Sequence, residues 1–287
     1  MDSIFIKKHK STFLILFVII IILSTSLGIL FALDFFSSDL RSPIKIESND
    51  EFLSYNFPGD GTQANPYIIE ESRIGASGRY AAGIEISNTN TFFIIRNCFI
   101  STNYIGIVLR NVATNTAIIV NNTCVSKSGR GGGIGLSDTR NCTILNNKCR
   151  NFMQGIHLNE ASHCLIQLNL IEKSNYQGIN IRYSSYNIIT NNTVKKCPQH
   201  GIALVGNARS NIIYNNFLID NAYSETYEVN GRLTGTINSQ AFDEGNYNYW
   251  YDEESKQGNW WSDYSWIGNY SIDGPAGTFD IYPKEID

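Results

Sequence analysis

The stretch that decides the fold covers residues 155–182 and reads GIHLNEASHCLIQLNLIEKSNYQGINIR. It opens with the pair Gly155-Ile156 and returns to the same pair at Gly178-Ile179, and apolar and polar residues alternate after each pair. Alternation with a period of two residues is typical of β-strands, and no segment between the pairs carries the apolar stripe of a long helix. The stretch therefore predicts a unit of short strands joined by tight turns.

The same unit recurs along most of the chain at a spacing close to 23 residues. Gly-Ile pairs begin at Gly83, Gly106, Gly133, Gly155, Gly178 and Gly201. An asparagine column runs beside them through Asn97, Asn122, Asn147, Asn169, Asn192 and Asn216. Asparagine tolerates left-handed backbone and suits a repeated sharp turn. Several columns that keep register at one period identify a solenoid. We therefore predict an all-β chain folded as a right-handed parallel β-helix of about seven rungs.

Composition agrees with a repetitive β protein and argues against one class of function. The 287 residues include 33 Asn and 40 Ile, which suits stacked turns and β-branched strand positions. The formal net charge is −4. A nucleic-acid-binding protein needs a basic face, so no nucleic-acid partner is expected.

The N-terminal region predicts export and a membrane anchor. Residues 13–32 form an uncharged, apolar run that follows three lysines. That length suits a transmembrane helix, and the positive-inside rule leaves residues 1–12 in the cytoplasm. A cleaved signal peptide is the alternative, since small residues that suit cleavage occur at 24–26. We expect a single-pass protein of the cell membrane with an extracellular domain, or a secreted protein if the segment is cleaved.

The exported part divides into three segments. Residues 33–61 are expected to form a linker and an N-terminal cap, residues 62–221 the β-helix repeats, and residues 222–287 an aromatic and acidic C-terminal cap. Caps are needed because the terminal rungs would otherwise expose unpaired strand edges. Four sequons mark candidate N-glycosylation sites at Asn121, Asn141, Asn191 and Asn269.

These columns, together with residues 58–70 (PGDGTQANPYIIE), resemble the NosD-like right-handed β-helix family. The group is also called CASH, for carbohydrate-binding proteins and sugar hydrolases. Residues 258–264 (GNWWSDY) are similar to a segment that often follows the helix in archaeal cell-surface members. The resemblance covers roughly residues 42–285 and implies a pectin-lyase-like fold. It leaves function open, because this scaffold serves lyases, hydrolases, adhesins and accessory proteins.

The bacterial namesake of the family assists copper delivery, so the resemblance also raises a metal role. A copper site needs clustered Cys, Met or His. The exported part has one methionine, three histidines and no Cys-x-x-Cys or His-x-His motif. The copper role does not transfer by residue, and we expect no metal site and no cofactor.

Two pairs of cysteines fall in equivalent columns of adjacent rungs, Cys124 with Cys149 and Cys142 with Cys164. Stacked residues lie about 4.8 Å apart, which is within disulfide reach at the Cα atoms. The sequence therefore leaves two alternatives, disulfides or stacked thiols in the core.

A polar patch is the candidate ligand-binding site. His157 and Asn159 occupy outward positions of one expected strand, and Asn180 and Arg182 occupy the matching positions of the next. These side chains offer the mixed donors and acceptors that sugars need, but no evident nucleophile and base.

A carboxylate pair is the weaker candidate, for catalysis. Asp138 and Glu160 each follow by two residues the leucine that closes a Gly-Ile-x-Leu strand. Adjacent rungs would place the two columns about 5 Å apart, which suits a retaining glycosidase.

The favoured function is therefore non-catalytic binding of extracellular polysaccharide or of surface proteins. A polysaccharide lyase or glycoside hydrolase is the first alternative. An accessory protein for metalloenzyme maturation is the second.

Overall fold

The computed structural model describes residues 40–224, 226–229, 232–265 and 267–286, and residues 41–287 belong to one compact unit. The predicted anchor at 13–32 lies outside the described residues. No helix within the described residues is long and apolar enough to cross a membrane. Membrane anchoring therefore stays a prediction.

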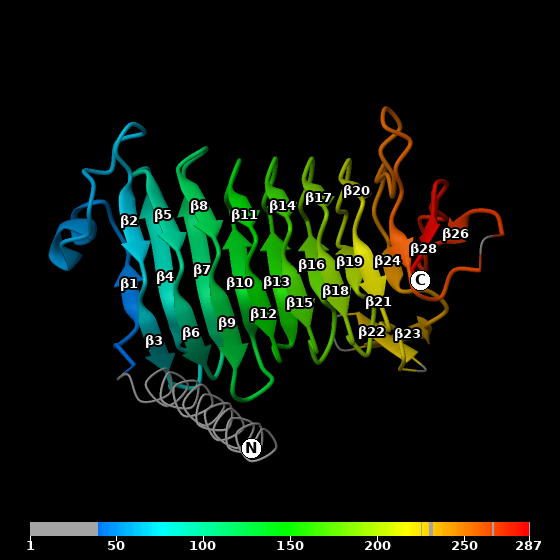
Figure 1. Ribbon diagram of the computed structural model, residues 1–287, viewed down its shortest axis with the longest axis horizontal. Helices are drawn as coiled ribbons and strands as arrows, with labels where there is room; N and C mark the ends of the chain where they lie inside the picture. Colours follow the sequence, from blue (N-terminus) through cyan, green and yellow to red (C-terminus); the bar gives the residue numbers. More distant parts are fainter. Residues whose placement is uncertain (1–39, 225, 230–231, 266, 287) are drawn as a thin grey trace, which may run out of the picture. The chain divides into compact units, whose positions relative to one another are not determined.

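The compact unit is a right-handed parallel β-helix, as predicted (Figure 1). It has about nine turns instead of the seven expected, because strands from both predicted caps join its sheets. Successive strands join three parallel sheets in turn, and we call these sheets 1, 2 and 3. Sheet 1 contains β1 (Ile44–Ile46), β4 (Ala82–Thr89), β7 (Ile105–Val112), β10 (Gly132–Ser137), β13 (Gln154–Asn159), β16 (Ile179–Arg182), β19 (Ile202–Val205) and β24 (Ala241–Asp243). Sheet 2 contains β2 (Tyr67–Glu70), β5 (Phe93–Arg96), β8 (Ala117–Val120), β11 (Thr143–Leu145), β14 (Leu165–Gln167), β17 (Ile188–Thr190) and β20 (Ile212–Tyr214). Sheet 3 contains β3 (Arg73–Ala76), β6 (Phe99–Thr102), β9 (Thr123–Ser126), β12 (Lys148–Arg150), β15 (Leu170–Glu172), β18 (Thr193–Lys195), β21 (Phe217–Ile219), β25 (Trp260–Trp261) and β28 (Lys284–Glu285).

The remaining described elements are short and lie at the two ends of the chain's β-helix. A 3-10 helix, η1 (Asp50–Tyr55), follows β1. Two antiparallel hairpins are formed by β22 (Thr226–Val229) with β23 (Arg232–Thr236) and by β26 (Tyr270–Ser271) with β27 (Phe279–Asp280).

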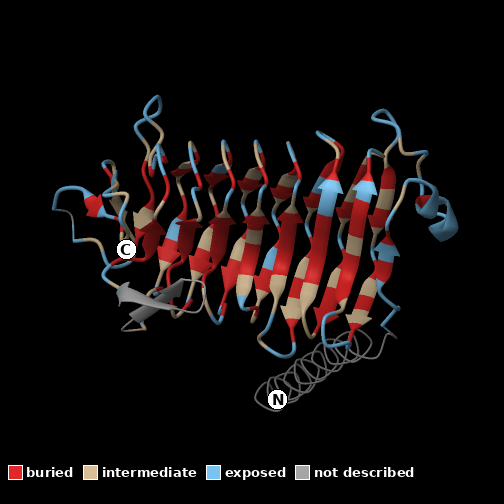
Figure 2. Ribbon diagram, turned by 180° about the vertical axis from the view of Figure 1, so that it is seen from behind, coloured by how far each residue is buried: buried red, intermediate tan, exposed pale blue. Residues whose placement is uncertain are grey.

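The Gly-Ile pairs mark the beginning of the sheet 1 strands because space there is limited. A Cβ atom on Gly133 would clash with the carbonyl oxygen of Gly155 and lie 2.7 Å from Sγ of Cys149. The isoleucines that follow the glycines are in register and fully buried, as Ile134 and Ile156 illustrate. Figure 2 shows this interior as continuous buried strands, with the exposed residues mostly at the turns and ends.

A buried asparagine ladder holds the turn between sheets 2 and 3. The Asn169 amide donates to the carbonyl oxygen of Ile144 (2.9 Å) and to Oδ1 of Asn192 (2.9 Å). Its Oδ1 accepts the backbone N–H of Asn147 at 2.9 Å. The same pattern repeats in neighbouring rungs, so these side chains satisfy backbone groups that would otherwise be buried without a partner.

The first member of this column was predicted one position too early. The N–H of Cys98, and not that of Asn97, donates to Oδ1 of Asn122 (3.0 Å). Asn97 instead occupies the preceding left-handed position (φ 54°), as Asn121 does (φ 57°). The error arose because Asn is common at both positions, so residue identity alone did not separate the two columns.

The parallel ladders continue into the segment expected to be a cap, since β24, β25 and β28 extend sheets 1 and 3. Within the GNWWSDY segment, Asn259 is the next member of the asparagine ladder. The side chains of Trp250 and Trp261 are fully buried, and their indole N–H groups donate to Asp243 and Asp280. These tail residues therefore close the end of the core.

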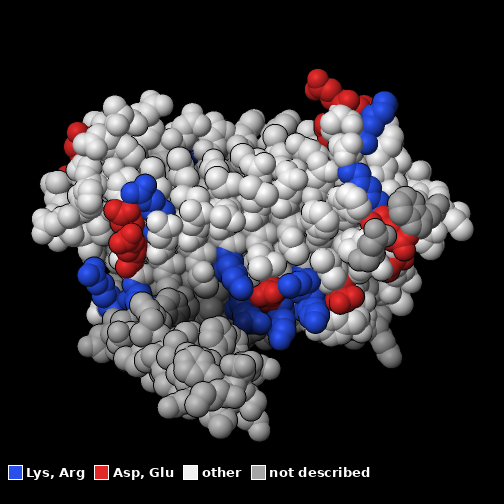
Figure 3. Space-filling model, in the orientation of Figure 1, with Lys and Arg blue, Asp and Glu red and all other residues white. Residues whose placement is uncertain are grey.

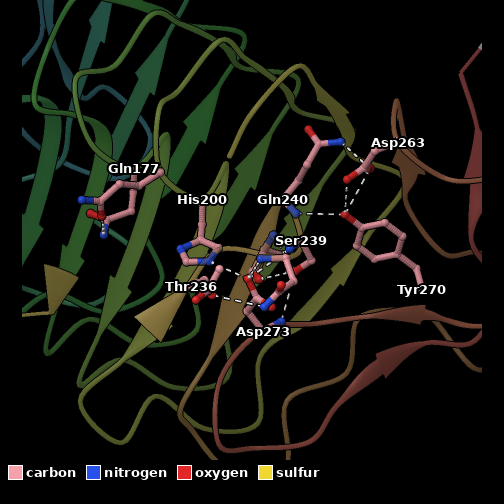
Figure 4. A network of polar contacts seen from close by, with 11 residues as sticks. Gln177, His200, Thr236, Ser239, Gln240, Asp263, Tyr270 and Asp273 are labelled. Atoms are coloured by element: carbon pink, nitrogen blue, oxygen red, sulfur yellow. Dashed lines mark hydrogen bonds and ion pairs between the residues drawn. The ribbon is translucent and has the colours of Figure 1, made fainter. Parts of the chain in front are cut away.

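A second polar network ties the tail to the last rungs (Figure 4). His200 Nε2 lies 3.2 Å from an Asp273 oxygen that also accepts the backbone N–H of Ser239 (3.0 Å). Burial opposes ionisation of Asp273, but these bonds outweigh it and lower the pKa of that carboxyl. The Tyr270 hydroxyl donates to Asp263. Because His200 is buried, we assign this network a structural role.

Candidate functional site

A hollow of about 480 Å³ lies at the turn that follows sheet 1, and we call it the corner hollow. Its lining comes from three adjacent rungs and the start of a fourth. The lining residues are Asp138, Arg140, Glu160, Ala161, Ser162, His163, Tyr183, Ser185, Tyr186 and Arg209.

Three of the lining residues have left-handed backbone and occupy one column of the β-helix. Asp138, Glu160 and Tyr183 have φ angles of 49°, 55° and 48°. The N–H of Asp138 donates to the carbonyl oxygen of Asn159 (3.1 Å), and that of Glu160 donates to Arg182 (3.1 Å). Asp138 and Glu160 thus occupy equivalent positions of adjacent rungs, where backbone spacing is about 4.8 Å.

A second column supplies cations and hydroxyls. Parallel bridges link Arg140 to Ser162, Ser162 to Ser185, and Ser185 to Arg209. The two arginines therefore lie at opposite ends of a row that runs along the β-helix. Their guanidinium groups make no hydrogen bond or ion pair with another described residue, and the same holds for the Asp138 and Glu160 carboxylates. These four charges remain available to a ligand.

Aromatic rings border the charged groups. Tyr186 stacks on His163 with a centroid distance of 5.1 Å. The Arg182 guanidinium lies 4.9 Å from the centre of the Tyr183 ring. Tyr183 is 45% exposed and Tyr186 49%, so both side chains remain accessible to solvent. Sequence reasoning missed Arg140, His163, Tyr186 and Arg209, although the repeat spacing places them one turn beyond the strands on which it concentrated.

The predicted polar patch lies at the edge of this hollow. His157 pairs with Asn180, and Asn159 with Arg182, across β13 and β16. Asn180 is only 4% exposed and its Oδ1 lies 3.2 Å from Nδ1 of His157. Burial, followed by the nearby Arg182 charge, lowers the pKa of His157 against the opposing Asn180 bond. Asn180 is therefore too covered to contact a ligand directly, while Arg182 connects the patch to the hollow through Tyr183.

The donors that a copper site would need are not gathered in the described part of this chain. All six cysteines are buried free thiols. Cys124 and Cys149 stack in register, and the Cys149 thiol and burial raise the pKa of Cys124, which keeps it protonated. Cys142 and Cys164 are likewise buried and unpaired. Among the described residues no three His, Cys, Asp or Glu side chains form a group that could hold a metal ion. These residues do not fit copper.

The four sequon asparagines all lie at turns of the β-helix or its tail. Asn121 and Asn269 are exposed, whereas Asn141 and Asn191 are half-buried. Glycosylation at these positions stays a prediction.

Solved structures similar to this chain are β-helix proteins. A periplasmic alginate epimerase is 18% identical with a TM-score of 0.43, over 56% of this chain and 42% of that one. The Dettilon tailspike protein is 17% identical with a TM-score of 0.40, over 62% and 43%. The A-module of an Azotobacter vinelandii mannuronan C-5 epimerase is 14% identical with a TM-score of 0.30, over 77% and 78%.

These likenesses concern the fold alone, and the chain spans less than half the length of the first two proteins. No curated protein matches the sequence. A family model described as "Periplasmic copper-binding protein (NosD)" matches residues 44–266, which is most of the chain. The chain therefore belongs to the NosD family.

Proposed function

We propose that this protein binds a glycan in the corner hollow and does not cleave it. The observation that carries the proposal is the presence of two half-exposed tyrosine rings beside unpaired charged groups in one hollow. Sugar rings stack on aromatic faces, and their hydroxyl groups need both donors and acceptors. Adjacent rungs of a rigid solenoid hold these groups in place before the ligand arrives.

The place of action is proposed to be outside the cytoplasm. The predicted apolar segment at 13–32 would export the β-helix, and the family description names the periplasm. We propose that the segment is retained and tethers the β-helix to the membrane. Extracellular polysaccharide or surface glycoprotein would then be the accessible ligand.

A glycan-array screen of the full chain, followed by tyrosine variants, tests the binding proposal. Tyr183→Asn and Tyr186→Asn keep a residue that tolerates left-handed backbone and remove the ring. Each should weaken binding of the array ligand by about fivefold to tenfold. Tyr247→Asn is the matched control, since Tyr247 is also left-handed (φ 58°) and is 79% exposed outside the hollow. Equal affinities for all three variants would refute the site.

Cleavage is the second candidate, because both carboxylates and both arginines line the same hollow. A retaining glycosidase needs two carboxyl groups about 5 Å apart, close to the rung spacing that separates Asp138 and Glu160. A reducing-sugar assay on the ligands found by the array decides between the two. If the wild type releases reducing sugar and both Asp138→Asn and Glu160→Gln abolish that release, the protein is a hydrolase and the binding proposal is wrong.

A further inference from the structure

Cationic side chains gather on a different face of the molecule, over β12, β15 and β18 of sheet 3 (Figure 3). We call this set the basic strip. It consists of Lys148, Arg150, Lys173, Lys195 and Lys196. The strip is a local feature, since the whole chain carries a net charge of −4.

One carboxylate lies among these cations and does not neutralise them. Glu172 Oε1 is 2.9 Å from Nζ of Lys195, and Glu172 Oε2 is 3.7 Å from both Lys148 and Arg150. Burial opposes ionisation of Glu172, but the three cations outweigh it and lower the pKa of the carboxyl. A single negative charge shared by three cations leaves the strip positive.

The two corner lysines extend the strip and are exposed. Lys173 and Lys196 both have left-handed backbone (φ 55° and 58°) and stack in adjacent rungs, because the N–H of Lys173 donates to the carbonyl oxygen of Lys195 (3.0 Å). Neither ammonium group forms a hydrogen bond or ion pair with a described residue. Their charge is therefore directed to solvent or to a ligand.

These lysines also line a hollow of about 450 Å³, together with Ser174, Asn175, Asp220 and Tyr223. The Tyr223 side chain is 66% exposed. The Asn175 amide donates to the carbonyl oxygen of Gly129 (3.0 Å), so the loop that carries Lys127 and Arg130 lies beside the hollow. The hollow thus combines two lysines and one carboxylate, that of Asp220, with an aromatic ring and polar side chains.

We propose that the basic strip and this hollow bind an acidic polysaccharide that carries carboxylates on successive sugars. Rungs repeat about every 4.8 Å, and the cations occupy neighbouring columns of three successive rungs, which presents positive charge along the β-helix to a linear polyanion. Lysine recognises carboxylates through charge-assisted hydrogen bonds. Tyr223 offers a ring face for a sugar, which a membrane surface or a nucleic-acid backbone would not require. The site is separate from the corner hollow and does not depend on it.

Binding of polygalacturonate to the full chain at low salt tests the proposal, with fully methyl-esterified polygalacturonate as the uncharged form of the same backbone. Polygalacturonate should bind, and the ester should bind at least about tenfold more weakly. Lys173→Asn and Lys196→Asn together should lower the affinity for polygalacturonate about tenfold without lowering the melting temperature, because Asn suits left-handed backbone. Tyr223→Ala should weaken binding of polygalacturonate and leave binding of poly-glutamate unchanged.

Two control variants show whether the binding belongs to the basic strip. Lys256→Asn removes an exposed lysine with the same left-handed backbone (φ 52°) outside the strip, and its affinity should equal that of the wild type. Tyr247→Asn should also leave polygalacturonate binding unchanged, because Tyr247 lines neither the corner hollow nor the hollow beside the basic strip. Equal binding of the ester would overturn the proposal. So would double-stranded DNA or anionic phospholipid vesicles that bind as tightly as polygalacturonate and respond to the same lysine variants.

Discussion

At the residue scale, the proposed glycan site coincides with a column of left-handed backbone at the turn after sheet 1. Six successive rungs place a residue with positive φ there: Asn88, Asn111, Asp138, Glu160, Tyr183 and Gly206. Asparagine, aspartate and glycine adopt this conformation readily, whereas it costs other residues about 1 kcal/mol. Glu160 and Tyr183, both in the lining of the corner hollow, are the two members of this column that adopt it at a cost.

Glu160→Asn should therefore stabilise the protein and weaken the site. Asparagine suits the left-handed position, and the Glu160 carboxylate has no hydrogen-bond or ion-pair partner among the described residues that would be lost. We expect the free energy of unfolding to rise by about 0.5–1 kcal/mol. Urea denaturation measures this change, and glycan affinity measured on the same sample should fall. A destabilised variant would show that the carboxylate supports the fold.

His157 should make stability depend on pH near neutrality. Its pKa in the folded protein is lowered below 6.5, mainly by burial. Below pH 6.5 the unfolded chain therefore binds a proton that the folded chain resists. The free energy of unfolding should therefore be highest above about pH 6.5 and should fall as the pH drops toward the pKa of His157 in the folded protein. Thermal melts of wild type and His157→Gln between about pH 5 and 8 check this, since the difference between the two should shrink in the acid range. A constant difference would exclude His157 as its source.

At the scale of elements, the turns are organised by three ladders of buried amides. One passes from Cys98 through the asparagine column to Asp280. A second passes from Cys164 through Asn187, Asn211 and Asn248 to Asp243. A third joins Cys197, Asn221 and Gln240. In each ladder a cysteine occupies the asparagine position of the first rung, where its backbone N–H is the donor. These three cysteines are therefore ladder ends packed in the core.

Asn169→Ala should be among the most damaging small substitutions in the β-helix. It removes donors to Ile144 and Asn192 and the acceptor of the Asn147 N–H, all of them buried. Each buried group left without a partner costs about 1–3 kcal/mol, so we expect a loss of about 3–5 kcal/mol. Asn159→Ala, at a half-buried strand position, should change stability by about 0.5 kcal/mol or less. Chemical denaturation of both variants checks the contrast. Similar losses would mean that the ladder contributes little beyond ordinary turn structure.

The elements could be predicted from sequence because their signals are repeated. The Gly-Ile pairs and the asparagine column gave the strands, the parallel stacking and the adjacency of Asp138 and Glu160. The sequence of one rung alone was not enough to align it with the others: the ladder position of the first rung was predicted at Asn97, and the structure places it at Cys98. The corner hollow was harder, because Arg140 and Arg209 are three rungs apart and belong together only once the turns are closed. Burial of Asn180 was missed because strand alternation predicts direction and not what neighbouring side chains cover.

At the scale of the whole molecule, the two proposed ligand-binding regions lie on one β-helix. The corner hollow lies after sheet 1, and the basic strip lies on sheet 3. The two regions lie on the same rungs but share no lining residue, so we expect them to act independently. Double variants that combine Tyr186→Asn with Lys173→Asn should show additive losses of binding free energy for a ligand that contacts both regions. Coupling larger than about 0.5 kcal/mol would indicate that one ligand or one motion connects them.

Membrane anchoring is a prediction that only the full chain can test. The apolar run at 13–32 follows lysines and is long enough to span a bilayer. Full-length protein should therefore fractionate with membranes and resist extraction by carbonate. N-terminal sequencing of the mature protein supplies the second readout. A soluble chain that begins near Leu27 would show cleavage and a secreted protein instead.

Closure of the C-terminal end should determine how the whole molecule unfolds. Trp261 is fully buried, stacks on Tyr270 with a centroid distance of 3.8 Å and donates to Asp280, so it covers the last rung of the core. Trp261→Ala should cost about 3–5 kcal/mol. In a solenoid each rung contacts only its neighbours, and the loss should be concentrated in the C-terminal rungs.

Amide hydrogen exchange distinguishes this local loss from a global one. In Trp261→Ala, protection should fall first in β20 and β21, while β7 and β10 keep their wild-type rates. Ile166→Asp, which buries a charge in the middle of the core, provides the opposite case and should prevent folding altogether. Uniform loss of protection in Trp261→Ala would mean that the β-helix unfolds as one cooperative unit, and a folded Ile166→Asp variant would contradict the register of the core.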